Sequence, residues 1–374
     1  MALVRGPGLG GTELHLYDLL LDRYDIRAFG LSQHKLDVTG SQVPCEYLSW
    51  GDAVGGRSLA NAYRSRFKSE RYYMPGLEKR LAGYQIVHTG EIHTTFSAQT
   101  ARAKKQAGYK LVVFATENIP FAGWNEPGGP ERKREVLEAA DFYLALTEDA
   151  RTVLRLEGVS DSKIRVVPYG VDLERFKAGP PDQELQQRFR LEPGRFTILF
   201  VGRLVWEKGI YDLLNAVGML NRKDIQLLFV GEGPERGNLE RYAEMIGLSS
   251  SVRFSSYLNF AEVHRAYSLA SVFVLPSIPT QGVREQFGIV LIEAMACGIP
   301  TIVTRCGSMP GVIRDAGLLA SPGDAVSLAE CLGRLADSPA MCRELGDRGV
   351  TLAQGVYDRK KVAEGIAEVY RQLL

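Results

Sequence analysis

The stretch Glu285-Gln-Phe-Gly-Ile-Val-Leu-Ile-Glu293-Ala-Met-Ala-Cys-Gly-Ile-Pro300 decides the fold of this chain. From Phe287 to Cys297 nearly every side chain is apolar, which predicts a helix that is enclosed on all sides. Two carboxylates interrupt the pattern, Glu285 at the start and Glu293 two turns further on. Eight residues of helical rise would separate them by about 12 Å. A charge as enclosed as that of Glu293 needs a partner.

A helix of this kind could hold a nucleotide sugar along its length. Free backbone N–H groups and the helix dipole at its start would attract the pyrophosphate. Glu285 would then reach the sugar, and Glu293 the ribose hydroxyls. The alternative is a capping glutamate followed by a salt-bridged core glutamate. Two glutamates at this spacing do not decide between these interpretations.

Length and composition limit the class of protein. The chain has 374 residues, which predicts two domains of ordinary size. A net charge of +1 argues against a dedicated nucleic-acid-binding protein. The five cysteines form no CxxC pair, so neither a disulfide framework nor a zinc site is expected, and a reducing cytoplasm fits. No run approaches the roughly 18 apolar residues of a membrane span.

The chain opens with a short strand, a glycine loop and a helix. The strand Ala2 to Val4 is followed by Gly6-Pro-Gly-Leu-Gly-Gly-Thr12, which has the outline of a phosphate cradle. Its match to GxGxxG would fit a dinucleotide site, but that site needs an acidic residue after the next strand. This strand, Ile26 to Leu31, ends in Ser32-Gln-His34, so NAD binding is disfavoured. The opening strand is short for its role, which leaves open that residues are missing upstream.

Two further buried strands, residues 85–88 and 111–114, end in polar residues. Alternation with helical stretches predicts a parallel doubly wound sheet, in which ligands bind beyond the carboxyl ends of the strands. Glu117 is a candidate site residue because nothing about a strand end requires an acid. His88 is better interpreted as a satisfied core histidine.

The same pattern restarts in the second half. After a proline and glycine stretch at 176–182, interpreted as a hinge, come a strand at 196–201, a loop at 202–209, a helix at 210–220 and a strand at 225–230. We therefore predict two Rossmann-like domains, an N-terminal domain over 1–177 and a C-terminal domain over 178–355. A terminal helix over 356–374 is expected to pack back on the first domain.

Arg203 and Lys208 lie in one loop at the carboxyl edge of the second sheet. Two fixed cations there could stabilise a departing nucleoside diphosphate without a metal. The alternative is a solvated loop whose charges pair with Glu207.

Together these motifs resemble glycosyltransferase family 4 (group 1). They are Gly202-Arg203 with Lys208-Gly209, the turn Phe229-Val-Gly-Glu-Gly-Pro234, Val274-Leu-Pro-Ser277 and the stretch from Glu285 to Pro300. Gly10-Gly11-Thr12, Pro168-Tyr-Gly-Val-Asp172 and the terminal Val369-Tyr370 are also similar to that family, so the resemblance spans nearly the whole chain. It implies the α/β GT-B fold, with two doubly wound parallel-sheet domains facing across a cleft. In this fold the N-terminal domain, 1–177, would be the acceptor side and the C-terminal domain, 178–355, would bind the nucleotide-sugar donor.

The resemblance also implies a function. Family members are retaining, metal-independent hexosyltransferases that use no cofactor and move a hexose from a nucleoside-diphosphate sugar to an acceptor hydroxyl of a glycan, glycolipid or small molecule, as in cell-envelope or polysaccharide biosynthesis. The implied catalytic residues are Arg203, Lys208, Glu285 and Glu117. The implied donor-binding residues are Gly10, Gly11, Thr12, Gly202, Arg203, Lys208, Gly231, Glu285, Gln286, Phe287, Gly288, Ile289 and Glu293. No metal ligands are expected.

The sequence departs from the family pattern at Glu117, where relatives frequently carry a histidine that contacts the donor sugar. Glu117 could bind a sugar hydroxyl or orient the acceptor instead. A related phosphorylase or epimerase and a non-catalytic nucleotide-sugar-binding protein stay open as alternatives. The basic stretch Arg57 to Arg80 is interpreted as a solvated amphipathic helix, with peripheral contact to an anionic membrane as the alternative.

Overall fold

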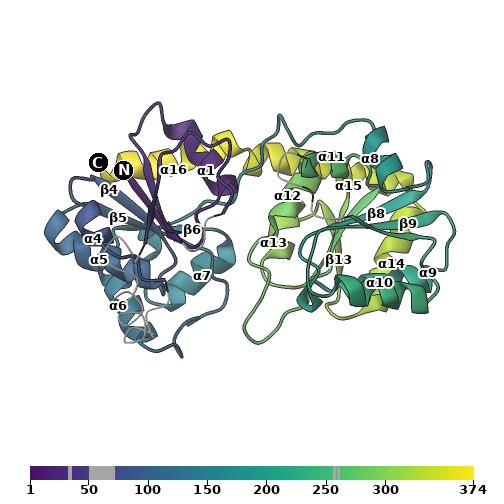
Figure 1. The fold of residues 1–374 in the computed structure, drawn as a ribbon, viewed down its shortest axis with the longest axis horizontal. Coiled ribbons are helices and arrows are strands. Elements are labelled where there is room, and N and C mark those ends of the chain that lie inside the picture. Colours follow the sequence, from purple (N-terminus) through teal and green to yellow (C-terminus); the bar gives the residue numbers. More distant parts are fainter. Residues whose placement is uncertain (33–35, 50–71, 256–257, 259–261) are drawn as a thin grey trace. The chain divides into compact units, whose positions relative to one another are not determined.

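Parallel strands form one sheet of seven strands and one of six in the computed structural model, which describes residues 1–32, 36–49, 72–255, 258 and 262–374 (Figure 1). Each sheet belongs to its own compact unit. Unit 1 contains Met1–Pro168 and Lys360–Leu374, and unit 2 contains Tyr169–Arg359. The predicted class, two doubly wound α/β domains, is confirmed.

In unit 1 the strands follow the order β3-β2-β1-β4-β5-β6-β7. Their bounds are β1 Ala2–Gly6, β2 Arg27–Leu31, β3 Cys45–Leu48, β4 Ile86–Gly90, β5 Lys110–Ala115, β6 Phe142–Ala145 and β7 Ile164–Val166. The helices are α1 Gly11–Tyr17, α4 Leu77–Arg80, α5 Thr95–Ala107, α6 Gly129–Ala139, α7 Glu148–Leu156 and α16 Arg359–Leu373. The order reverses between β1 and β4, which places the switch point of the sheet at the ends of these two strands.

Two hydrophobic cores cover the two faces of this sheet. Because successive side chains of a strand point to opposite faces, Leu111 and Val113 of β5 join the core under α4, α5 and α6. Val112, between them, joins the core under α1 and α16. Near-continuous apolar strands are thus what a sheet buried on both faces requires.

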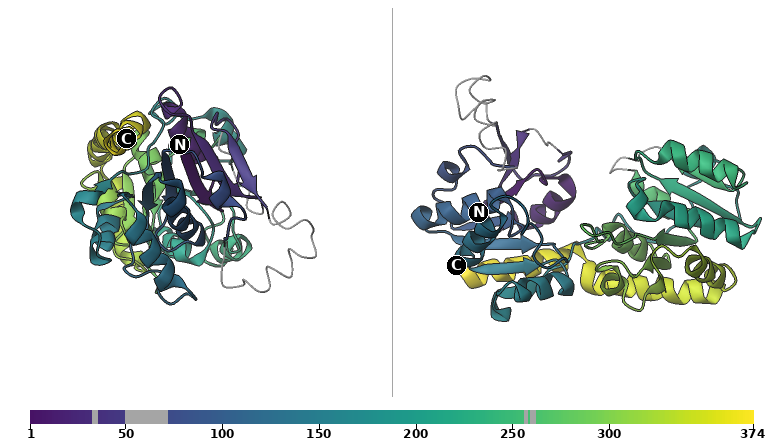
Figure 2. Two further views of the ribbon diagram at one scale, coloured as in Figure 1. Left: turned by 90° about the vertical axis from the view of Figure 1, so that its left-hand side faces the viewer. Right: turned by 90° about the horizontal axis from the view of Figure 1, so that it is seen from below.

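In unit 2 the order is β10-β9-β8-β11-β12-β13. The strands are β8 Phe196–Val201, β9 Ile225–Val230, β10 Val252–Ser255, β11 Val272–Leu275, β12 Thr301–Thr304 and β13 Gly317–Ala320. The helices are α8 Gln183–Arg188, α9 Ile210–Leu220, α10 Arg236–Met245, α11 Val263–Tyr267, α12 Ile289–Ala296, α13 Met309–Ile313, α14 Ala325–Ala336 and α15 Pro339–Leu352. Helices α9, α10 and α14 lie on one face and α15 on the other (Figures 1 and 2).

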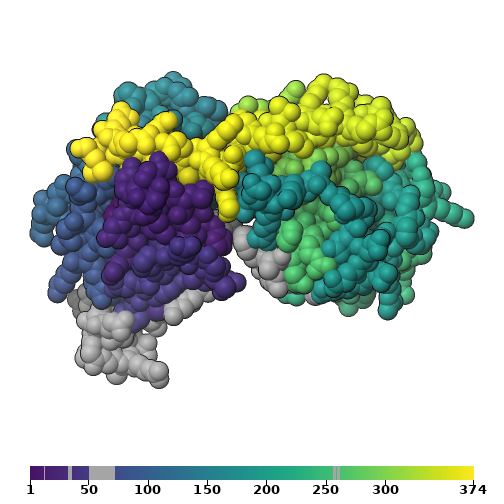
Figure 3. Space-filling model, turned by 90° about the horizontal axis from the view of Figure 1, so that it is seen from above, coloured from purple at the N-terminus to yellow at the C-terminus, as the bar shows by residue number. Residues whose placement is uncertain are grey.

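The terminal helix α16 packs on unit 1, beside the segment that opens the chain (Figure 3). Val362, Ile366 and Tyr370 on one stripe of this helix are buried in the core that also contains Leu3 and Leu14. Ion pairs such as Arg23–Glu364, at 2.7 Å, flank the apolar contact at the surface.

The helix in the Glu285 stretch begins later than the sequence predicts. It starts at Ile289, because Gly288 adopts a left-handed conformation with φ +77° and caps it. Glu285 therefore lies in a loop, and the predicted separation based on helical rise does not apply. The helix is enclosed over most of its surface, since Leu291, Ile292 and Met295 are fully buried, but the predicted enclosure on all sides is not complete, because Ile289, Val290 and Glu293 are only half-buried.

Candidate functional site

The loops after β8, β9 and β11 form one rim at the carboxyl edge of the six-stranded sheet. Backbone bonds join them: Gly202 N–H donates to Val230 O (3.0 Å), Leu204 N–H to Glu232 O (2.8 Å), and Ile278 N–H to Glu207 O (2.8 Å). The convergence expected for parallel strands is therefore present in unit 2.

Glycines make this close approach of backbones feasible. A Cβ atom at Gly231, which has φ +145°, would lie 2.0 Å from Gly202 O. A Cβ atom at Gly209 would lie 1.9 Å from Pro276 O. Any other residue at either position would force the loops apart, so Gly209 and Gly231 allow the backbones of the rim to approach closely.

Lys208, Glu285 and Ser277 meet on this rim. The Lys208 ammonium lies 2.5 Å from Glu285 Oε2, and Ser277 Oγ donates to the same oxygen at 3.0 Å. Thr304 Oγ1 donates to Ser277 O at 2.5 Å and fixes that residue in turn. Sequence reasoning gave Ser277 no role, although it lies in the quoted motif at the end of β11.

Arg203 is not part of this cluster. Its side chain is 73% exposed, and its guanidinium lies 3.8 Å from Glu207. This is the pairing with Glu207 that was expected for a solvated loop. An ion pair that is so exposed and so long does not hold the Arg203 side chain firmly. Of the two predicted cations, only Lys208 is fixed beside Glu285.

The segment before α12 presents backbone rather than side chains. The Phe287 ring is buried, edge to face against Tyr169 (5.3 Å between centroids) and Tyr357 (5.8 Å). The Ile289 side chain is half-buried at the helix start. At this end of α12, the backbone N–H groups of Phe287, Gly288 and Ile289, rather than their side chains, are therefore the groups that suit an anion.

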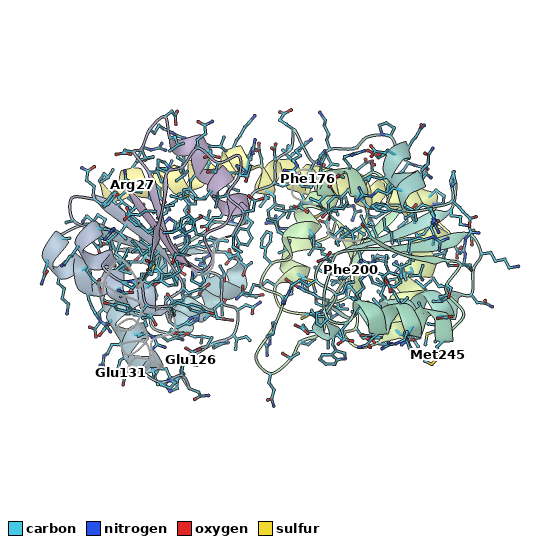
Figure 4. The ribbon with its side chains drawn as sticks, viewed as in Figure 1. Arg27, Glu126, Glu131, Phe176, Phe200 and Met245 are labelled. Carbon is cyan, nitrogen blue, oxygen red and sulfur yellow. The ribbon has the colours of Figure 1, made fainter. Side chains whose placement is uncertain are left out.

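Glu293 lies on α12 with a hydroxyl partner. Tyr267 donates to Glu293 Oε2 at 2.5 Å, and Phe176, which Figure 4 labels, packs edge to face against the Tyr267 ring at 5.7 Å. Burial raises the pKa of Glu293 to about 7, while the Tyr267 hydroxyl and the charge of Arg175 partly oppose the rise. The sequence carries no signal for Tyr267, because the fold alone brings it to the helix.

In unit 1, the glycine loop Gly6–Thr12 joins β1 to α1. Gly10 caps α1 from an extended conformation, and Gly11 N–H donates to Asp37 O at 2.8 Å. A Cβ atom at Gly11 would lie 2.9 Å from that same oxygen. Thr12 follows in the first turn of α1.

Glu117 and Glu91 follow the neighbouring strands β5 and β4. Glu117 Oε1 accepts the N–H groups of Asn118 and Ile119, both at 3.0 Å. Glu91 has φ +63°, and its Oε1 accepts from the N–H (2.9 Å) and the hydroxyl (2.5 Å) of Thr116. Burial raises the pKa of each carboxyl, and the charge of Glu91 raises that of Glu117 further.

Four remaining predictions concern the basic stretch Arg57 to Arg80, metal binding, membrane-spanning helices and His88. Most of the basic stretch Arg57 to Arg80, residues 57–71, lies outside the described residues. Among the residues that are described, no group of His, Cys, Asp and Glu is arranged to hold a metal ion. In the same part of the chain, no helix combines the length and apolarity needed to cross a membrane. His88 is fully buried, which confirms that it is a core histidine, but only its Nδ1 is hydrogen-bonded, and its buried Nε2 has no partner among the described residues.

Comparison with known proteins identifies relatives along most of the chain. Residues 181–351 match the family model described as glycosyl transferases group 1, and residues 30–175 match that of glycosyltransferase family 4. A D-inositol 3-phosphate glycosyltransferase of Acidothermus cellulolyticus is 30% identical over 317 residues, which cover 78% of this chain and 68% of the relative. A second protein of that name, from Catenulispora acidiphila, is 28% identical and covers 87% of this chain and 78% of its own.

Solved structures share the fold. HepE of Anabaena, solved in complex with UDP, superimposes with a TM-score of 0.78 at 19% identity over 99% of both chains. Sucrose-phosphate synthase of Thermosynechococcus elongatus gives a TM-score of 0.70 at 22% identity, over 100% of this chain and 99% of its own.

Proposed function

Because this chain belongs to the group 1 glycosyltransferases, we propose that it moves a hexose from a nucleoside-diphosphate sugar to an acceptor hydroxyl, with retention of configuration and without a metal. Transferase activity follows from the family itself. Retention and metal independence rest on the resemblance of its motifs to that family.

The cluster of Lys208 and Glu285 is the observation that supports the donor role. The Lys208 ammonium is held at the carboxyl rim of a parallel sheet, where such sheets bind phosphorylated ligands. A fixed positive charge there would stabilise the nucleoside diphosphate as it leaves. We propose that Arg203, exposed and weakly paired, turns to a second phosphate oxygen.

Glu285 and Glu293 would then bind the two sugars of the donor. Glu285 already accepts from Ser277 and Lys208, so it is fixed and can accept a hydroxyl of the hexose in addition. Glu293 would accept the ribose hydroxyls in place of water. Gly10 and Gly11 would meet the phosphates through their backbones.

Glu117 is proposed to orient the acceptor hydroxyl. Two backbone N–H groups already hold its Oε1, so the carboxyl is fixed and its other oxygen can accept from a substrate. With Glu91 following the adjacent strand β4, the ends of β4 and β5 offer carboxyl oxygens that suit a hydroxyl-rich molecule.

A ligand panel tests this function directly. Binding to the folded state raises thermal stability, so UDP, GDP, ADP and dTDP, and then their sugars, are compared by thermal shift. One relative in fold, HepE of Anabaena, has been solved with UDP and with UDP-glucose, which makes uridine nucleotides the first choice.

Product analysis with and without acceptor distinguishes the remaining functions. Transfer requires acceptor, persists in EDTA and gives a product with the anomeric configuration of the donor. A product formed from phosphate alone would instead identify a phosphorylase, and an isomerised nucleotide sugar an epimerase. A stabilising ligand that is never turned over would indicate a binding protein.

A further inference from the structure

A chain of buried polar groups connects the last helix of unit 1 to its glycine loop. Tyr370 on α16 and Tyr17 on α1 both contact His88 Nδ1 through their hydroxyls, at 2.6 and 3.3 Å. Arg5 at the end of β1 donates from Nη2 to the Tyr17 hydroxyl (3.1 Å) and from Nε to Glu13 Oε1 (2.6 Å). We call these five residues the Arg5 network.

The network is enclosed, so its members depend on one another. Arg5, Tyr17, His88 and Tyr370 are between 0 and 6% exposed. Arg5 also donates from Nη1 to His88 O at 2.8 Å, so all three nitrogens of its guanidinium donate hydrogen bonds within the network. A buried guanidinium is tolerated only while its partners remain in place, because losing one leaves a charge or a donor unpaired.

The state of His88 sets the direction of these bonds. Burial and the nearby charge of Arg5 hold the pKa of His88 well below its usual range, so the ring is neutral. A neutral ring carries one proton, on Nδ1 or on Nε2, and Nδ1 accordingly donates to the Tyr370 hydroxyl or accepts from it. Replacing the hydroxyl of Tyr370 therefore deprives His88 Nδ1 of its shortest hydrogen bond.

Arg5 and Glu13 flank the glycine loop Gly6–Thr12. The loop starts directly after Arg5, where Gly8 N–H donates to Arg5 O at 2.9 Å. It ends directly before Glu13. At Gly6, with φ +54°, an added Cβ would lie 2.6 Å from the Phe96 ring, so the loop also lies against α5. The Arg5–Glu13 ion pair thus ties the two ends of the loop to each other.

We propose that Tyr370, acting through His88 and Tyr17, positions Arg5 and Glu13 and so holds the glycine loop in the shape that binds the donor. The proposal rests on the donor role given above to Gly10 and Gly11. Tyr370 is in this view a positioning residue of the terminal helix, remote from the reacting atoms.

Two tyrosine-to-phenylalanine variants test the proposal, each of which removes one hydroxyl where α16 packs on unit 1. Tyr370→Phe removes the bond to His88. Tyr24→Phe is the matched control, since the Tyr24 hydroxyl donates to Ala367 O of α16 at 3.3 Å and its ring packs on Tyr370 at 5.5 Å, outside the Arg5 network. The kinetic constants for donor and acceptor are measured for both variants, together with hydrogen exchange of the loop amides.

We expect Tyr370→Phe to lower kcat/KM for the donor about tenfold, the size of one buried hydrogen bond, with the acceptor KM unchanged. Loop amides 6–12 exchange faster in Tyr370→Phe alone. Equal losses in Tyr370→Phe and Tyr24→Phe, or loop exchange as slow as in the wild type, would reduce Tyr370 to a packing residue and overturn the proposal.

Tyr17→Phe provides a second route should Tyr370→Phe not fold. It breaks the bond from Arg5 while leaving the α16 hydroxyl on His88, and the same loop exchange and donor effect are expected. Because hydrogen exchange is read without substrate, a wild type that transfers no sugar refutes the proposed function alone, whereas an active wild type with unaffected variants refutes only the positioning role.

Discussion

The carboxyl edges of the two sheets have the same backbone design and opposite chemistry. In unit 2 the carboxylate of Glu285 is neutralised by Lys208 at 2.5 Å. In unit 1, Glu91 and Glu117 follow adjacent strands, and the pKa of each carboxyl is raised by burial. The loops after β8 and β11 thus hold a fixed cation, which we propose for a phosphate, and the ends of β4 and β5 carry carboxyl groups, which we propose for hydroxyls. Parallel sheets with the same general winding can therefore differ in the ligands that they suit through the residues at their strand ends.

Loss of the cation from the unit 2 edge should have the largest effect. Lys208→Ala removes the positive charge held by Glu285 and leaves that carboxylate without its ion-pair partner. We expect kcat to fall by about 10²-fold, as on removal of a group that stabilises a developing anion. Steady-state transfer at saturating donor measures it.

Lys223→Ala is the control for that change. Lys223 is exposed and precedes β9, so it lies at the opposite, amino edge of the same sheet. Its loss should leave kcat unaltered. Comparable turnover in Lys208→Ala and Lys223→Ala would show that the fixed cation has no part in the departure of the nucleotide.

A smaller effect is expected at the unit 1 edge. Glu117→Gln keeps the oxygen that accepts from the N–H groups of Asn118 and Ile119 and replaces the other oxygen with a donor. The KM for the acceptor should rise about tenfold, as for one lost hydrogen bond, while the KM for the donor stays constant. Initial rates with each substrate varied in turn separate the two.

Glu126→Gln is matched to this change, since Glu126 lies on the same loop after β5, with an exposed side chain beside Arg132 (Figure 4). It should leave both KM values unchanged. A rise in the donor KM in Glu117→Gln would reassign Glu117 to the donor sugar, the role of the histidine that it replaces.

The fold and the rim could be predicted from the sequence because they depend on local patterns. Strands β8 and β9 have the bounds expected from their apolar runs, since a glycine follows each of them. Convergence of their loops then follows from parallel topology alone.

Two kinds of feature could not be predicted from the sequence. The first is contacts between residues that are distant in the chain, and the second is a backbone conformation that interrupts a helix within a continuous apolar run. Tyr267 bonds Glu293 from 26 residues away, and no periodicity connects the two. Gly288 delays α12 by adopting a left-handed conformation, although the apolar run continues through it. Arg203 and Lys208 have equal charge in one loop, and only the folded rim distinguishes the fixed cation from the exposed one.

The smallest expected effect concerns Glu293 and pH. Burial raises the pKa of this carboxyl from its ordinary value of 4.5 to about 7, so near neutral pH it is only partly ionised. Ribose hydroxyls donate best to the ionised form. Donor affinity should therefore increase as the pH rises from 6 to 8, by at most about tenfold, the ratio of the ionised fractions of a group with this pKa at the two pH values. Titration of the donor by calorimetry measures it.

Glu293→Gln cannot ionise, and so its donor affinity should be independent of pH over the same range. The contribution of Glu293 to the stability of the free protein should depend on pH in the opposite direction. Native Glu293 keeps its proton up to about pH 7, whereas the unfolded chain releases it near 4.5, so this group's contribution to stability declines as the pH rises through that window. A wild type whose donor affinity is flat with pH, or falls, would remove Glu293 from the ribose and leave it as a core acid held by Tyr267.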